Sequence, residues 1–102
     1  MARVVFMGTP QFAVPSLEAL AEYHDVAGVV TQPDRRAGRG RKTVPTPVKE
    51  AALLHGIPVF QPASLHTRES IDHLASWQPE VIAVFAYGQL LPAPVLELPP
   101  HG

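Results

Sequence analysis

The sequence predicts an open α/β fold whose strands are parallel. Short apolar segments alternate along the chain with segments whose apolar residues recur every three or four positions, and this alternation favours a sheet covered by helices. Segment 81–86 is apolar at every position, which is typical of a strand with both faces covered. The chain has 102 residues, 46% of them hydrophobic, so it can form one domain with a core but not two.

The first half predicts strand, helix, strand. Residues 3–7 form an apolar, β-branched run that the turn Gly8-Thr9-Pro10 ends. Pro15 suits the first turn of the following helix, and residues 26–30 predict a second strand. The apolar face of the helix is expected to comprise Val14, Leu17, Leu20, Ala21 and His24.

Two further helices carry start signals. Thr46 has the side chain of an N-cap, Pro47 suits the first helical position and Gly56 suits the end. A third helix should begin after Thr67 and end before Pro79. The expected apolar faces are Val48, Ala51, Ala52 and His55 in one helix and Ile71, Leu74 and Ala75 in the other.

The remaining strands set the predicted topology. Residues 57–60 predict a short strand, which Pro58 places at an edge, and 81–86 predict the fourth strand before a short helix over 92–98. The common doubly wound arrangement gives the strand order 3-2-1-4. Ligands in such sheets bind beyond the carboxyl ends of the strands at the switch point, which here lies between residues 8–12 and 86–90.

A basic segment interrupts an otherwise acidic chain. Residues 35–42 hold five of the eight bases, so this segment carries +5 and the rest carries −6. The connection 31–45 is longer than the two to six residues usual between a strand and a helix. Phosphate binding is the functional interpretation, because arginines bond phosphates bidentately, and a solvated connection is the alternative.

Several function classes find no support. The turn at Gly8 is not Gly-x-Gly-x-x-Gly, which disfavours a nicotinamide or flavin cofactor. The five histidines form no metal-ligand pattern, and no Ser-His-Asp arrangement is recognisable, so we predict no metal and name no catalytic residue. The absence of cysteine suits a cytoplasmic protein, and no apolar run approaches the roughly 20 residues of a membrane span, so we expect no membrane partner.

The exit of the fourth strand, Tyr87-Gly88-Gln89-Leu90-Leu91, is the second candidate site. It is either a plain strand-to-helix connection or one wall of a pocket. In the second case, fixed backbone groups would grip a flat polar ring such as a pterin or purine, and Leu90, Leu91 and Val95 would line the pocket.

Five segments are distinctive in their order and spacing: Met7-Gly8-Thr9-Pro10-Gln11-Phe12-Ala13-Val14-Pro15, Thr31-Gln32-Pro33-Asp34-Arg35, Ala37-Gly38-Arg39-Gly40, Pro45-Thr46-Pro47-Val48-Lys49 and Ala86-Tyr87-Gly88-Gln89-Leu90-Leu91-Pro92. Together they resemble the bacterial methionyl-tRNA formyltransferases. Two departures stand out: Gln11 where an acid is usual, and Arg36 where proline is usual.

The resemblance implies a Rossmann-like domain that moves a formyl group from 10-formyltetrahydrofolate to methionine on initiator tRNA. It implies that residues 1–102 are the first half of the catalytic domain, ending before the fifth strand and the catalytic residues, so that this chain alone is inactive. The implied site residues are Arg35, Arg36, Arg39, Arg41 and Lys42 for the tRNA acceptor arm, Tyr87, Gln89, Leu90, Leu91 and Val95 for the folate, and the substrate-site turn Gly8, Thr9 and Pro10.

Two alternatives stay open. The first is another 10-formyltetrahydrofolate-dependent formyltransferase, which the basic loop disfavours because small substrates do not need it. The second is an RNA-binding module without catalysis. We further expect the full-length protein to be monomeric and this chain to self-associate through an unprotected edge of 81–86.

Overall fold

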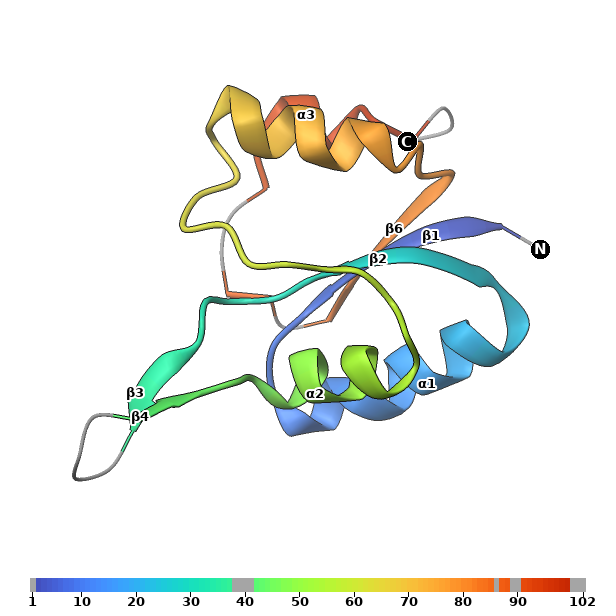
Figure 1. Cartoon of the computed structure of the whole chain (residues 1–102). Helices are drawn as coiled ribbons and strands as arrows, with labels where there is room; N and C mark the ends of the chain where they lie inside the picture. The colour runs from blue at the N-terminus through green and yellow to red at the C-terminus, as the bar shows by residue number, and fades with distance from the viewer. Residues whose placement is uncertain (1, 38–41, 86, 89–90, 100–102) are drawn as a thin grey trace.

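A computed structural model describes residues 2–37, 42–85, 87–88 and 91–99. It contains a parallel sheet between two layers of helices and a small separate hairpin (Figure 1). In chain order the elements are β1 (Arg3–Gly8), the 3-10 helix η1 (Gln11–Ala13), α1 (Val14–Tyr23), β2 (Asp25–Val30), β3 (Arg35–Ala37), β4 (Lys42–Val44), α2 (Pro47–Leu54), β5 (Val59–Phe60), α3 (Arg68–Ser76), β6 (Val81–Phe85) and α4 (Ala93–Leu96).

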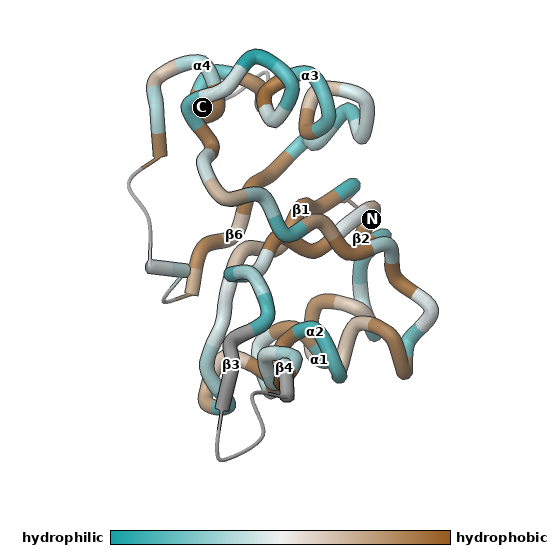
Figure 2. The backbone as a smooth tube through the Cα atoms, turned by 60° about the vertical axis from the view of Figure 1, so that its left-hand side comes forward, coloured by the Kyte–Doolittle hydropathy of each residue, from teal (hydrophilic) through white to brown (hydrophobic). Residues whose placement is uncertain are grey.

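The main sheet has the order β5-β2-β1-β6, with parallel pairing throughout. This confirms the predicted order 3-2-1-4, since β5 and β6 are the predicted third and fourth strands. Helices α1 and α2 cover one face, and α3 and α4 cover the other (Figures 1 and 2).

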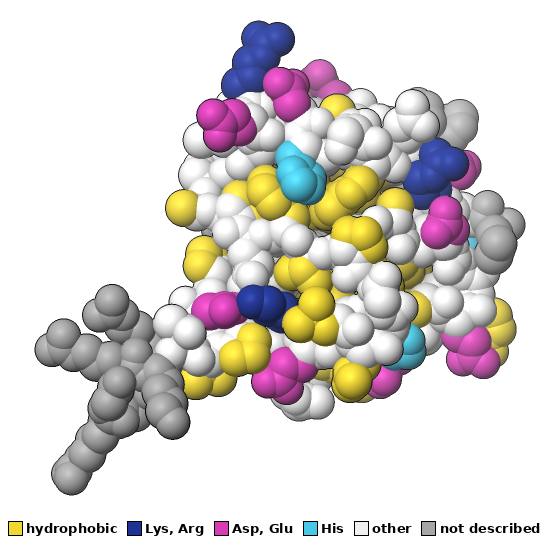
Figure 3. All heavy atoms as spheres, in the orientation of Figure 1, with side chains coloured by type: hydrophobic (Ala, Val, Ile, Leu, Met, Phe, Trp, Pro, Cys, Tyr) yellow, Lys and Arg dark blue, Asp and Glu magenta, His cyan; other side chains and the backbone are white. Residues whose placement is uncertain are grey.

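Strand β1 supplies both halves of the core because successive side chains point to opposite faces. Phe6 packs with α1 and α2, whereas Val5 and Met7 pack on the α3 side. All three side chains are fully buried. On the face shown in Figure 3, hydrophobic side chains gather across the middle, between α3 and α2.

The predicted helix caps are confirmed. Thr46 Oγ1 accepts a hydrogen bond from Lys49 N at 3.1 Å, and Thr67 Oγ1 accepts one from Ser70 N at 3.1 Å. Gly56 follows α2 with a φ of +68°, as expected of a glycine at a helix end. His24 was placed on the helix face, but it lies just beyond α1 in extended backbone, where its Nδ1 accepts from Ala2 N at 3.1 Å.

Two local expectations were wrong. The connection 31–45 is not a plain loop, because β3 and β4 pair within it as an antiparallel hairpin that extends from the body (Figure 1). Three-residue strands rich in charged residues carry too weak a pattern to be recognised from sequence. The faces of β6 are less covered than expected, since Val81, Val84 and Phe85 are 41–45% exposed. Its place at an edge of the sheet agrees with the predicted order 3-2-1-4.

Candidate functional site

Strands β1 and β6 lie side by side, so the switch point falls where the sequence placed it. Gly8 ends β1 in a crowded position: a Cβ there would lie 2.8 Å from the Phe85 carbonyl oxygen and 2.9 Å from the Phe6 ring. The chain can therefore turn tightly into Thr9, whose Oγ1 donates a hydrogen bond to the Tyr87 carbonyl oxygen at 3.0 Å. This bond ties the exit of β1 to the exit of β6.

Gln32 ties β2 to the same point. Its Nε2 donates to the Tyr87 carbonyl oxygen at 3.2 Å, and its backbone N–H donates to Thr9 Oγ1 at 3.4 Å. Gly88 has a φ of +101°, and a Cβ on it would lie 2.8 Å from Gln32 Nε2. Polar groups that follow β1 and β2 thus converge on the carbonyl group that follows β6. The next position, Gly88, suits only a residue without a side chain.

The Tyr87 side chain turns away from this network into the core. It is 1% exposed and packs with Met7, Leu65 and Val95 among others. Its hydroxyl has no hydrogen-bond partner within the part of the chain that the structure describes. Burial raises the pKa of Tyr87 to about 12, so the group is neutral at physiological pH.

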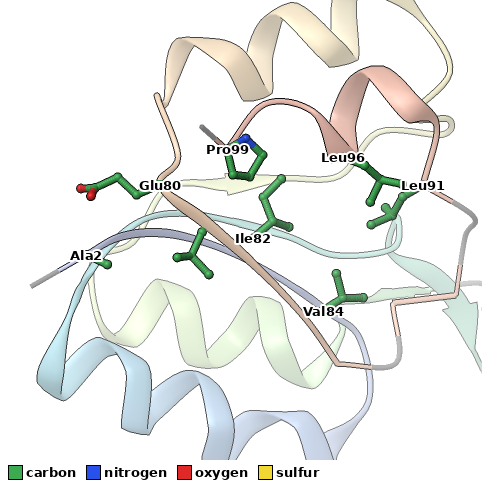
Figure 4. Close-up of a pocket in the computed structure, with 8 residues that line it drawn as sticks. Ala2, Glu80, Ile82, Val84, Leu91, Leu96 and Pro99 are labelled. Atoms are coloured by element: carbon green, nitrogen blue, oxygen red, sulfur yellow. The ribbon is translucent and has the colours of Figure 1, made fainter. Parts of the chain in front are cut away.

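An apolar pocket of about 290 Å³ lies beside β6 (Figure 4). Ile82 and Val84 of β6 line it, together with Leu91 before α4 and Leu96 within α4 (Figure 4). Glu80 stands at the end where β6 begins. The pocket can hold a flat or aliphatic group against the strand, and its lining carries little polar chemistry of its own.

The hairpin forms what we call the arm, meaning β3, β4 and the residues between them. A polar cluster, here called the neck, joins the two ends of the arm. Lys49 Nζ bonds Asp34 Oδ2 at 3.0 Å and Oδ1 at 3.2 Å. Gln61 Nε2 donates to Asp34 Oδ1 at 2.6 Å and to the Gln32 carbonyl oxygen at 3.1 Å.

A second, buried tie lies under this ion pair, between the hydroxyls of Thr31 and Thr46 at 2.7 Å. The hydrogen bond from Gln61 and the Lys49 ammonium hold the pKa of Asp34 below its usual value. Asp34 is therefore a carboxylate at neutral pH. The neck thus combines the ion pair of Asp34 and Lys49 with the buried hydrogen bond between Thr31 and Thr46.

Some of the predicted site residues fall within this description. The backbones of Arg35 and Arg36 lie in β3, and Lys42 begins β4, whereas Arg39 and Arg41 lie outside the described residues. Gln89 and Leu90 also lie outside them. Leu91 lines the pocket beside β6, and Val95 is fully buried in α4 beneath it.

The neck residues Asp34, Lys49 and Gln61 were not among the predicted site residues. Asp34 and Gln61 lie in two separate connections and Lys49 lies in the first turn of α2, so the three share no local motif. Among the described residues, no group of three or more histidine, cysteine, aspartate or glutamate side chains could hold a metal ion. No helix in the described ranges is long and apolar enough to cross a membrane.

Comparison with known proteins agrees with this geometry. A family model described as formyl transferase matches residues 2–102. The methionyl-tRNA formyltransferase of Syntrophomonas wolfei is 54% identical over 101 residues, which are 98% of this chain and 32% of the relative. That of Methylococcus capsulatus is 55% identical over 101 residues, covering 98% and 33%.

Solved structures share the fold at low identity. Phosphoribosylglycinamide formyltransferase from Streptococcus pneumoniae matches with a TM-score of 0.66 at 13% identity, covering 96% of this chain and 52% of the other. The enzyme from Bacillus halodurans gives 0.63 at 19% identity, covering 94% and 50%. The chain spans about a third of the length of the curated relatives it matches. From its family match over residues 2–102, the chain belongs to the formyl transferase family.

Proposed function

We propose that this chain is the first part of the catalytic domain of a formyltransferase. The enzyme transfers a formyl group from 10-formyltetrahydrofolate to the amino group of methionine on initiator tRNA in the cytoplasm. Family membership and the names of the relatives support formyl transfer. Since the relatives are about three times as long, we expect this chain to be inactive alone. For the full-length protein we propose a monomer.

The arm is the observation that carries the choice of substrate. It extends from the body beside the exits of β1 and β2, and its segment 35–42 holds five of the eight bases of the chain. A small substrate such as glycinamide ribonucleotide has no need of such an extension, whereas an RNA acceptor arm offers a line of phosphates. The proposed RNA-binding residues are Arg35, Arg36, Arg39, Arg41 and Lys42.

The formyl donor is proposed to bind at the exit of β6. The pocket of about 290 Å³ beside β6 gives an apolar wall in Leu91, and the exposed turn residue Gly88 follows the same strand and offers backbone groups. Val95, fully buried in α4, is proposed to support the wall, and Gln89 and Leu90, which lie outside the described residues, are proposed to belong to the same donor site. Tyr87 contributes backbone only, since its ring is in the core. The turn Gly8-Thr9-Pro10 would face the transferred group.

The test is a chimera in which residues 2–102 replace the matching segment of the Syntrophomonas wolfei relative. We expect it to formylate methionyl initiator tRNA and not glycinamide ribonucleotide. Arg39→Ala should lower kcat/KM for the tRNA about tenfold or more without changing the KM for the folate. Formylation of the small substrate alone would overturn the proposal, and RNA binding without formyl transfer would favour a non-catalytic module.

A second variant tests the folate wall. Leu91→Asp should raise the folate KM, because it sets a charge against an apolar surface. Leu54→Asp is the matched control, since Leu54 is 88% exposed on α2, away from the pocket. An unchanged folate KM in a folded Leu91→Asp chimera would move the donor site elsewhere.

A further inference from the structure

The arm cannot fix its own direction. Its strands have only three residues each, and an isolated two-stranded hairpin of this size is not independently stable in water. At about 3.3 Å per residue, three-residue strands reach roughly 10 Å from the body, so a rotation at the neck displaces the far ends of β3 and β4. The contacts at the neck must therefore set where the arm points.

Among the described residues, the ion pair at the neck is more buried than the other ion pairs. Asp34 and Lys49 are 28% and 22% exposed, whereas Arg68 and Asp72 form an i,i+4 pair at 3.7 Å with 91% and 67% exposure. The Asp34 carboxylate also accepts from Gln61, so both of its oxygens are engaged. Exposed pairs contribute little, but a partly buried carboxylate held by two donors has a defined position.

The Asp34–Lys49 pair can position the arm because of where its two residues lie in the chain. Asp34 immediately precedes β3, and Lys49 lies in the first turn of α2, a few residues after β4. The pair therefore joins the segments that enter and leave the arm. Gln61, just after β5, bonds both Asp34 and the Gln32 carbonyl oxygen, which anchors the neck to the sheet.

We propose that the Asp34–Lys49 pair, braced by Gln61, is a clamp that positions the arm for RNA, although none of the three side chains itself needs to touch RNA. This inference rests on the proposed function, because it assumes that the arm binds RNA. The three are positioning residues, and the bases of the arm are the contacts.

The direction in which Asp34→Ala changes RNA affinity distinguishes the clamp from long-range electrostatic attraction. Asp34→Ala removes a negative charge beside five bases, so long-range attraction alone would tighten RNA binding. The clamp predicts the opposite, a loss of about tenfold in affinity, because the arm loses its direction. Glu50→Ala is the charge-matched control: Glu50 is an exposed acid next to Lys49 with no part in the clamp, and its loss should leave binding unchanged or slightly tighter.

The experiment measures binding of the full chain and its variants to an RNA hairpin with a single-stranded 3′ end, over a series of salt concentrations. Arg39→Ala should reduce the slope of log K against log salt by roughly 0.7 to 0.9, as expected when one phosphate contact is lost. Asp34→Ala should weaken binding at every salt concentration with the slope unchanged. Gln61→Met, which leaves all charges in place, should weaken binding in the same direction by a smaller factor.

A double-mutant cycle completes the test. If Lys49 acts only through Asp34, Asp34→Ala with Lys49→Ala binds no worse than Asp34→Ala alone. Additive losses, or unchanged or tighter binding in Asp34→Ala, would overturn the clamp. Failure of Arg39→Ala to alter binding would instead refute the RNA-binding role of the arm, so the two failures are distinguishable.

Discussion

The β5 side of the sheet and the β6 side differ in what their outermost strands leave exposed. β5 has two residues, lies between Pro58 and Pro62, and is followed by Gln61, which donates into the neck. β6 has five residues, all apolar, and no described strand pairs with its outer edge. The β5 side carries polar groups that bond one another, and the β6 side ends in a strand with no partner among the described strands, beside an apolar pocket.

This difference separates two kinds of surface. Short strands flanked by proline do not invite further pairing, so the β5 side is free to support the arm. An apolar strand edge with neither charge nor proline within it is a surface that another chain segment can cover. The β6 side is therefore the side from which contacts between molecules should arise.

The largest expected effect is on association. We predict that this chain self-associates through β6 and that Val84→Lys, at a residue 43% exposed, weakens the association at least about tenfold, because an edge lysine opposes pairing. Leu54→Lys is the control, since Leu54 is more exposed but lies on α2. Sedimentation velocity over a range of concentrations measures the change. A chain that stays monomeric, or an equal effect of both variants, would contradict the open edge.

The next effect tests whether β6 is firmly seated against β1. Gly8→Ala should lower the free energy of unfolding by about 3 kcal/mol, because its Cβ meets the Phe85 carbonyl oxygen at 2.8 Å and backbone must move. Gly56→Ala should cost only about 1 kcal/mol, since Gly56 has a φ of +68° but no atom within 4 Å of the added Cβ. Urea unfolding compares the two. Equal losses of stability would mean that β6 can move away from the added Cβ at Gly8 with no loss of free energy.

Much of the fold could be predicted because its signals are local. Thr46 and Thr67 are N-caps in sequence and in structure, and strand order followed from the alternation of elements and a common topology. The basic connection was recognised from the sequence, but the hairpin within it was not, because β3 and β4 have three residues each and neither shows an apolar periodicity. The edge position of β6 followed from the predicted strand order, but the exposure of its faces could not be read from its composition, because an apolar run does not show what covers it.

The candidate site divides in the same way. The convergence of Thr9 and Tyr87 followed from the switch-point rule, and the structure joins them by a hydrogen bond at 3.0 Å. The contact of Asp34 with Lys49 spans 15 residues, and its brace, Gln61, lies 27 residues from Asp34. Such pairs depend on how two connections and the start of α2 pack at one end of the sheet, which no local pattern encodes.

A smaller effect tests the polar side. Thr46→Ala should destabilise the chain by about 2 kcal/mol, because it removes an N-cap and leaves the buried Thr31 hydroxyl without its partner. Thr67→Ala removes the N-cap of α3, but Ser70 Oγ keeps its bond to the Ser64 carbonyl oxygen, so about 1 kcal/mol is expected. Thermal and urea unfolding report the difference. If both variants lose the same stability, the Thr31–Thr46 bond contributes nothing to the neck.

The smallest expected effect on stability concerns the buried hydroxyl of Tyr87. The Tyr87 hydroxyl is buried without a partner among the described residues, so Tyr87→Phe should be neutral or stabilise the chain by up to about 1 kcal/mol.

Because burial raises the pKa of Tyr87 from 10.0 to about 12, the unfolded chain ionises this tyrosine at a lower pH than the folded chain. The stability that neutral Tyr87 provides is thus complete below pH 10 and is lost as the pH rises towards 12. Urea unfolding between these limits should show a loss that Tyr87→Phe lacks and that Tyr23→Phe, at a residue 67% exposed, retains. A marked destabilisation by Tyr87→Phe at neutral pH would mean that the hydroxyl forms a hydrogen bond, and that the core beneath the exit of β6 contains a polar contact.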